Sequence, residues 1–312
     1  MIVQQGIAAF TAGRGGCLTI GNFDGVHRGH QRILGTLVAQ ARECGVPAVA
    51  MTFDPHPIVL LAPHRAPPNL STLSRKTELI ERCGVDVLVV VETSRELLQL
   101  APEEFFERIV RGDLAAGGMV EGPNFYFGRD RAGDVGLLQT LCIQAGMTFE
   151  VVDPVEHNGQ IVSSSVIRRA ISAGQVRDAV DQLGHPYQLA GTVVSGMQRG
   201  RQIGFPTANL AEMSTLLPAD GVYAGSTRLD NRTFAAAVHI GPNPTFGDDD
   251  RKIEVHLLGF TGDLYGQLLS VDLLSEIRPT RTFDSRDQLI RQVQQDLQSV
   301  ALLVAGECQG EP

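Results

Sequence analysis

A pair of histidines, His27 and His30, stands where a phosphate could be held. The pair follows an apolar stretch that starts at Cys17 and a GNFDG turn, and it precedes a stretch with helical spacing of apolar residues. A strand that leads through a glycine-rich turn into a helix presents free N–H groups and the positive end of the helix dipole to an anion. Gly29 lets a phosphate approach the backbone, and two imidazoles could stabilise charge on an α-phosphate during in-line displacement. A bare pair of this kind often only opens a helix, but the strand and turn before it favour a phosphate site.

Three consecutive serines, residues 163–165, begin a second predicted helix, and Arg168 follows about one turn later. Hydroxyls at a helix N-terminus and a guanidinium one turn on can hold a phosphate. Taken alone, such serines are usually helix caps. Together with the histidine pair, they are interpreted as the other half of one phosphate site.

A second group of polar residues lies in the other half of the sequence. Glycines at positions 196, 200 and 204 permit backbone conformations in which several N–H groups converge on an anion. Thr207 and Asn209 follow, and their oxygens suit Mg²⁺. The GxxxxGK[ST] pattern is absent, which excludes a P-loop NTPase. A glycine-rich hairpin that binds nothing remains an alternative for the glycines alone.

The stretch KIEVHLL alternates, so Glu254 and His256 share one face of a predicted strand. A carboxylate that faces a pocket can accept the proton of an attacking hydroxyl in phosphoryl transfer. A carboxylate on the solvent face of an antiparallel strand is the commoner case. The alternation leaves both interpretations open.

The elements that would position these residues differ between the two halves. The first half alternates Val-, Ile- and Leu-rich runs with amphipathic stretches, including a helix that ends at Gly45 and another over residues 102–114. This pattern predicts a doubly wound, Rossmann-like α/β domain with a parallel sheet, over residues 1–183.

After about Gly184 the sequence consists of short strands with Gly, Pro, Asn and Asp between them. We expect a small antiparallel β-barrel over residues 184–312, with the boundary between Arg177 and Pro186. Apolar residues from Leu289 to Val304 recur at helical spacing, which predicts a terminal helix capped by Asp284 or Ser285.

The composition excludes several classes of protein. The 312 residues carry 26 basic and 35 acidic side chains, a net charge of −9, so general binding of nucleic acid or of an anionic membrane is not expected. No stretch approaches the apolar length of a membrane-spanning helix, and the N-terminus lacks the features of a secretory signal. The five cysteines are scattered and form no CxxC motif. We expect a soluble, reduced, cytoplasmic protein.

The motifs resemble those of a known family. GNFDGVHRGH and SSSVIR resemble the HxGH and ISSTxxR motifs of nucleotidylyltransferases, while TFDPHP and EGPNFYFGRDRAGD resemble the bacterial bifunctional riboflavin kinase/FAD synthetase family. This resemblance implies transfer of AMP from ATP to FMN. It implies that His27, His30 and Arg168 act in catalysis, that the loop from Asn124 through Phe125 to Phe127 faces the flavin, and that the nucleotide is bound by Gly21, Asn22, Phe23, Asp24, Gly25, Gly29, Ser164 and Ser165. Phe53 and Tyr126 are further candidates for an apolar flavin slot.

The second half resembles the riboflavin kinase module of the same family through GRxxGFPTANL, LPADGVYAG, IGPNPTFG, EVHLLGFTGDLYG and IRPTRTFDS, in that order. The resemblance implies that Glu254 is the general base for the ribityl 5′-hydroxyl and that Thr207 and Asn209 bind ATP with Mg²⁺. Gly196, Gly200, Arg201 and Gly204 would then contact the phosphates. The sequence departs from the family at Asn124 and Ser165 in the first half, and at Asn243, Gly259 and Thr280 in the second.

We therefore expect an enzyme that makes FMN from riboflavin and then FAD from FMN, with ATP, Mg²⁺ and flavins as its small-molecule ligands. One alternative keeps the adenylyltransferase and loses or narrows the kinase, because of the last three departures. A second alternative is a flavin- and nucleotide-binding sensor without turnover, which would require the catalytic polar groups to be missing. A kinase assay with riboflavin distinguishes the expected bifunctional enzyme from these alternatives.

Overall fold

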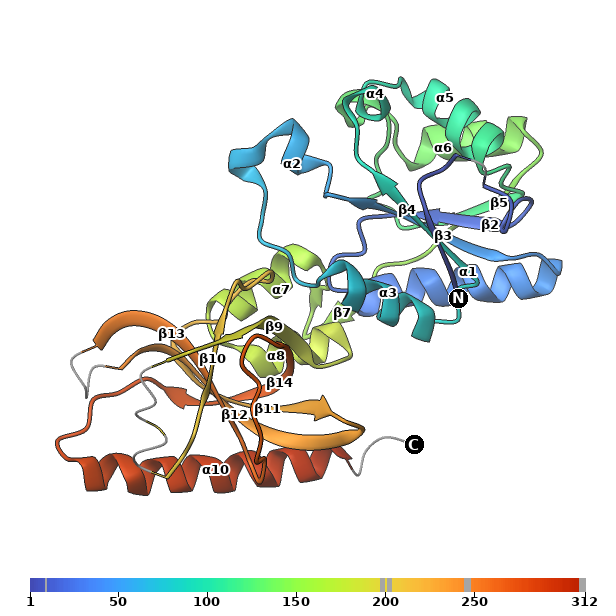
Figure 1. Cartoon of the computed structure of the whole chain (residues 1–312). Helices are drawn as coiled ribbons and strands as arrows, with labels where there is room; N and C mark the ends of the chain where they lie inside the picture. The colour runs from blue at the N-terminus through green and yellow to red at the C-terminus, as the bar shows by residue number, and fades with distance from the viewer. Residues whose placement is uncertain (9, 197–199, 201–203, 244–247, 309–312) are drawn as a thin grey trace. The chain divides into compact units, whose positions relative to one another are not determined.

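The computed structural model describes residues 1–8, 10–196, 200, 204–243 and 248–308. The chain forms two compact units, residues 1–163 and 164–312, which are treated separately below (Figure 1). The predicted boundary lies further along the chain, because helices α7 (Ser164–Ser172) and α8 (Val176–Leu183) group with the second unit. Helix α8 packs against two barrel strands, which explains this grouping. The assignment of residues 1–183 and 184–312 to two functional domains stays a prediction.

The first unit is built on a six-stranded sheet with the order β1-β4-β3-β2-β5-β6, in which every neighbouring pair is parallel. Its strands are β1 (Ile2–Gln5), β2 (Cys17–Ile20), β3 (Ala48–Asp54), β4 (Val87–Glu92), β5 (Gly118–Glu121) and β6 (Thr148–Val151). The chain runs outward from β2 through β3 and β4, and then returns to β2 on its other side with β5. Ligands in open α/β sheets bind at the carboxyl ends of the strands beside such a switch point.

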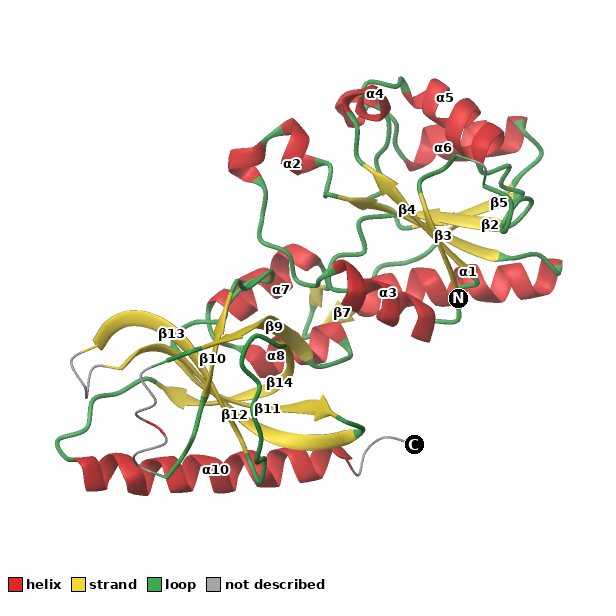
Figure 2. Ribbon diagram, viewed as in Figure 1, coloured by secondary structure: helices red, strands yellow, loops and turns green. Residues whose placement is uncertain are grey.

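Helices cover both faces of this sheet (Figure 2). The longer ones are α1 (Arg28–Cys44), α3 (Leu73–Arg82) and α6 (Val135–Gln144), and the shorter ones are α4 (Arg95–Leu98) and α5 (Pro102–Phe105). Helix α2 (Ile58–Leu61) has no buried residue and lies away from the sheet (Figure 2). The predicted helix over residues 102–114 is α5 continued by a π-helical segment, Phe106–Asp113. Short 3₁₀ turns lie at Pro63–Arg65 and Arg129–Arg131, and a small hairpin is formed by β7 (Glu156–His157) and β8 (Gln160–Ile161).

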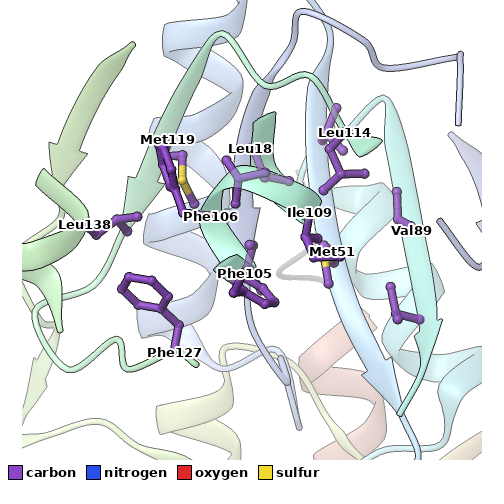
Figure 3. Packing of buried hydrophobic residues seen from close by; sticks show 14 of the residues in the cluster. Leu18, Met51, Val89, Phe105, Phe106, Ile109, Leu114, Met119, Phe127 and Leu138 are labelled. Carbon is purple, nitrogen blue, oxygen red and sulfur yellow. The ribbon is translucent and has the colours of Figure 1, made fainter. Parts of the chain in front are cut away.

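The two faces of the sheet bury two separate cores. Successive residues of β3 alternate between them. Met51 packs with Phe106 in one core (Figure 3), to which Val49 also belongs. Ala48 and Ala50 pack in the other core, with residues of α1 and α3. This alternation is the geometry of a strand, and the near-continuous apolar sequence follows from burial on both sides. The predicted doubly wound α/β fold is confirmed.

The second unit contains a closed antiparallel barrel with the order β10-β13-β12-β11-β14-β9. Its strands are β9 (Tyr187–Val194), β10 (Ala208–Ala211), β11 (Gly221–Leu229), β12 (Arg232–Asn243), β13 (Asp248–Leu257) and β14 (Leu268–Pro279). Closure of the sheet removes the exposed strand edges that would otherwise promote aggregation. The predicted barrel is confirmed.

Helix α10 (Arg286–Cys308) covers one side of the barrel. Val300 and Val304 pack against barrel residues, and an ion pair of 2.8 Å joins Arg278 of β14 to Asp296. The hydroxyl of Ser285 accepts a hydrogen bond from the N–H of Gln288, as predicted for a helix cap.

Candidate active sites

The loop after β2 is fixed to the chain that leads into α3. The carboxylate of Asp24, which is 7% exposed, accepts hydrogen bonds from the N–H groups of Leu70 and Ser71 at 3.0 and 3.1 Å. The N–H of Gly25 donates to the hydroxyl of Ser71. Asp24 therefore anchors the loop, and a direct contact between this carboxylate and a nucleotide stays a prediction.

Phe23 forms part of the core rather than of an exposed surface. Its ring is 2% exposed and meets His30 edge-on, with ring centroids 5.4 Å apart. A Cβ placed on Gly21 would lie 3.0 Å from this ring, so only a glycine leaves the ring undisturbed there. Gly21 and Phe23 can therefore serve a nucleotide through their backbone.

The two predicted histidines lie together at the start of α1. Their rings stack with centroids 3.6 Å apart, and Nδ1 of His27 accepts a hydrogen bond from the N–H of His30. The proton of the His27 ring is therefore on Nε2, from which it can donate to a phosphate oxygen. A Cβ on Gly29 would lie 3.1 Å from the His27 ring, so the glycine leaves room for the ring above the helix start.

Burial sets the charge of His30. Burial lowers its pKa well below the usual value, and the neighbouring His27 and Lys76 act in the same direction. Nδ1 of His30 is buried and has no hydrogen-bond partner in the structure. The ring is thus neutral at pH 7 and retains one N–H donor and one acceptor.

Lys76 is a cation of this site that sequence reasoning missed. It is 8% exposed, and its Nζ lies 3.4 Å from Oγ1 of Thr52, which in turn donates to the carbonyl of Asn22. Burial lowers the pKa of Lys76, while Asp24 and Asp54 act against this shift. The only signal in the sequence is that Lys76 falls on the buried face of an amphipathic helix.

The predicted flavin loop is partly core. Phe127 is buried against Phe105 and stacks on Phe125 at 5.7 Å, whereas Asn124 is exposed. Tyr126 is also exposed, and Arg131 lies 4.7 Å above its ring. The flavin contacts of this loop stay a prediction; its exposed side chains are Asn124 and Tyr126, and Phe125 is half-buried.

The predicted serine motif begins α7. Ser164 is the first residue of this helix, Ser165 the second, and Arg168 lies about one turn further on, in the order that the sequence indicated. These residues belong to the second unit. Their role beside the histidine pair stays a prediction.

In the barrel, the predicted glycines lie against the predicted oxygen ligands. A Cβ placed on Gly196 would lie 2.2 Å from Nδ2 of Asn209, and one on Gly200 would lie 3.3 Å from Oγ1 of Thr207. Gly204 has a φ of 92°, which glycine adopts without strain. Arg201 falls outside the described residues.

Glu254 lies beside these groups through the register of the barrel. On β13 it pairs with Asn209 of β10 on one side and with His239 of β12 on the other. Ile253 and Val255 are buried, whereas Glu254 is partly exposed, so the predicted alternation holds. The register therefore brings the expected base and an expected ligand of the ATP complex to neighbouring positions.

His256 shares the face of Glu254 and fastens the adjoining loop. Its Nδ1 lies 2.7 Å from the carbonyl oxygen of Pro206, and its ring meets Phe205 edge-on at 5.9 Å. These contacts hold the segment just before Thr207 against β13. His256 is therefore a structural part of the site.

The departures in the second half have different structural settings. Gly259 has a φ of 72° in the turn after β13, a conformation that favours glycine. Oγ1 of Thr280 is buried without a hydrogen-bond partner. The side chain of Asn243 falls outside the described part of the chain.

The described residues contain neither a membrane-spanning helix nor a metal-binding cluster of histidine, cysteine and acidic side chains. No helix there is both long and apolar enough to cross a membrane. No group of three or more His, Cys, Asp or Glu side chains in the same part of the chain is arranged to hold a metal ion.

A parallel α/β unit with a glycine-rich loop before α1, together with a barrel that places Glu254 beside Asn209, is the architecture expected of a transferase with two nucleotide-dependent modules. Models of known families divide the chain in the same way: FAD synthetase matches residues 10–166, and riboflavin kinase matches residues 183–303. The chain belongs to the bifunctional riboflavin kinase/FMN adenylyltransferase family, and it is an enzyme with both activities.

Full-length relatives support this assignment. The chain is 38% identical over 293 residues to the bifunctional riboflavin kinase/FMN adenylyltransferase of Pseudomonas fluorescens, which covers 94% of each chain. The corresponding protein of Escherichia coli strain K12 is 36% identical over 90% of each chain, and that of Bacillus subtilis is 35% identical over 90% of each.

A solved structure shares the fold. A crystal structure named as a macrolide-efflux protein from Streptococcus pneumoniae matches 96% of this chain and 99% of its own, with a TM-score of 0.85 and 30% identity. Its name differs from those of the family models and of the full-length relatives. The family assignment rests on these models and relatives.

Proposed function

We propose that the two reactions occur at separate sites, with riboflavin phosphorylated on the barrel and FMN adenylylated at the carboxyl edge of the parallel sheet. The observation that carries the kinase assignment is the barrel register that places Glu254 beside Asn209. The stacked histidines at the start of α1 support the adenylylation assignment.

On the barrel, Glu254 accepts the proton of the ribityl 5′-hydroxyl as its oxygen attacks the γ-phosphorus of ATP. The new bond joins that oxygen to phosphorus, the bond to the β-phosphate oxygen breaks, and ADP leaves. Glu254 is partly exposed on an outward face, so a substrate hydroxyl can reach it. The N–H groups near Gly196 and Gly200, with Arg201 and Gly204, hold the phosphates.

The donors near Gly196 and Gly200 fit a magnesium ion. The hydroxyl of Thr207 and the carboxamide oxygen of Asn209 belong to the oxygen donors that Mg²⁺ prefers, and this ion is usually shared between few protein groups and the phosphates of the substrate. Bound there with ATP, Mg²⁺ would neutralise charge on the transferred phosphoryl group.

At the sheet edge, a phosphate oxygen of FMN attacks the α-phosphorus of ATP, and pyrophosphate leaves. His27 donates from Nε2 to the phosphate oxygens, and neutral His30 does so with its single N–H. Gly21, Asn22, Gly25 and Gly29 surround the phosphates, and the family motif adds Ser164, Ser165 and Arg168. Asn124, with the loop to Phe127, faces the flavin.

We further propose that the enzyme works in the cytoplasm on small-molecule substrates, namely ATP, riboflavin and FMN. The cysteines whose state the structure gives, Cys17, Cys44, Cys83 and Cys142, are free thiols, as a reducing compartment permits.

The kinase assignment is tested by Glu254→Gln, which removes the base and keeps the size of the side chain. We expect riboflavin phosphorylation to fall by about 10²-fold or more, and adenylylation of supplied FMN to stay near normal. Glu212→Gln is the matched control. Glu212 is an exposed carboxylate of the same unit, and it accepts a hydrogen bond from the hydroxyl of Thr192. Retention of full kinase activity by Glu254→Gln would refute the proposed base.

A further inference from the structure

The pairing of β2 with β5 ends before either strand does. Its last registered pair is Leu18 with Met119, whereas β2 continues along β3 to Ile20, and β5 continues along β6 to Glu121. The two strands therefore separate at the switch point of the sheet, just before the loop that starts at Gly21. A side chain bridges the gap: a carboxyl oxygen of Glu121 accepts a hydrogen bond of 2.7 Å from the N–H of Ile20.

The carboxyl group of Glu121 is buried, which is unfavourable for an acidic side chain. Glu121 is 2% exposed in the interior of the unit. Burial raises its pKa well above the usual value, while the N–H of Ile20 and the hydroxyl of Thr19 act in the opposite direction. A buried acid lowers the stability of the fold unless its hydrogen bonds compensate. Buried acids with shifted pKa values are often found at functional sites.

The loop is held differently on its two sides. On the β3 side, the N–H of Gly21 donates to the carbonyl of Met51, and Thr52 donates to the carbonyl of Asn22. On the β5 side, the hydrogen bond from Ile20 to Glu121 replaces the missing backbone ladder.

We propose that Glu121 is a positioning residue for FMN adenylylation, because its carboxyl group holds the end of β2 and thereby the phosphate loop that leads to His27. The proposal rests on the assignment of this loop to the adenylylation site. Glu121 does not touch the reacting atoms; it fixes where the loop N–H groups point. Displacement of such groups by about 1 Å can cost about 10²-fold in rate.

Two substitutions separate positioning from simple support of the fold. Glu121→Gln keeps an acceptor oxygen at the same distance and resembles the protonated acid, whereas Glu121→Val keeps an apolar filling and removes the acceptor. We expect kcat/KM for FMN adenylylation to fall by about 10- to 100-fold in the valine variant and to stay within about twofold in the glutamine variant. Hydrogen exchange of a peptide covering residues 18–27 should be faster in the valine variant alone. Riboflavin phosphorylation by the same full-length proteins should be unchanged.

Two results would overturn the proposal: a folded valine variant with normal adenylylation, or a glutamine variant as impaired as the valine variant. His30→Ala, measured in parallel, tests the underlying site. If His30→Ala keeps full adenylylation, the site assignment itself fails. If it loses adenylylation while Glu121→Val does not, only the role of Glu121 fails.

Discussion

Gly196→Ala tests the barrel site through a single added methyl group. The new Cβ would lie 2.2 Å from Nδ2 and 2.6 Å from Cγ of Asn209. Ordinary carbon contacts begin at about 3.5 Å, so the carboxamide must move by more than about 1 Å. Gly196 lies outside the left-handed region, so alanine fits its backbone, and the effect is confined to the collision.

The expected cost to stability is small, and the expected cost to activity is large. Asn209 is partly exposed and can rotate away, so we expect the free energy of unfolding to fall by about 1 kcal/mol, at the low end for overpacking. A displacement of about 1 Å in a group that positions ATP should lower kcat/KM for riboflavin phosphorylation by about 10²-fold. Adenylylation of FMN in the other unit should not change.

The assay follows FMN formation from riboflavin with purified full-length protein, beside a denaturant titration. Gly306→Ala is the matched control: it lies in α10 of the same unit, where a Cβ meets nothing within 4 Å, and it should keep full activity. Normal kinase activity in folded Gly196→Ala would show that the position of Asn209 does not matter for the reaction and would refute the reasoning.

Three further predictions concern stability. Asp24→Ala leaves two buried N–H groups near α3 without their acceptor, and denaturant unfolding of the first unit should show a loss of about 2 to 4 kcal/mol. Burial raises the pKa of Glu121, so the contribution of this group to the stability of the unit is fully present below about pH 4.3, the value of an unperturbed glutamate, and is lost as the pH rises through the folded pKa. Glu121→Gln has no such titration, so the melting temperature of the unmodified chain relative to that of the glutamine variant should fall as the pH is raised in a series of thermal melts. Asp296→Ala leaves Arg278 largely buried without its partner and should cost about 3 kcal/mol, measured as easier unfolding of the barrel; an unchanged midpoint would contradict this.

Local sequence patterns predicted the position of the histidine pair because strand, turn and helix are encoded within about thirty residues. The same holds for Glu254, whose outward position follows from the alternation of its strand. Its neighbours Asn209 and His239 depend on barrel register, which a pattern within one strand does not specify.

Other features of the sites depend on long-range contacts. Lys76 meets Thr52 across two elements, and Asp24 meets backbone groups at residues 70 and 71. The partners of Lys76 and Asp24 cannot be predicted from local spacing, because the sheet order and the helix packing determine which residues meet. Phe127 shows the same limit, since an aromatic residue in a motif can fill a core as well as face a ligand.

We propose that two separate sites carry the two reactions. A chromatographic time course with ATP, Mg²⁺ and either riboflavin or FMN, run on the unmodified chain, Glu254→Gln and His30→Ala, tests it most directly. We expect FMN and then FAD from the unmodified chain, FAD only from supplied FMN in Glu254→Gln, and FMN without FAD in His30→Ala. Loss of both activities in either variant, with the fold intact, would contradict the claim.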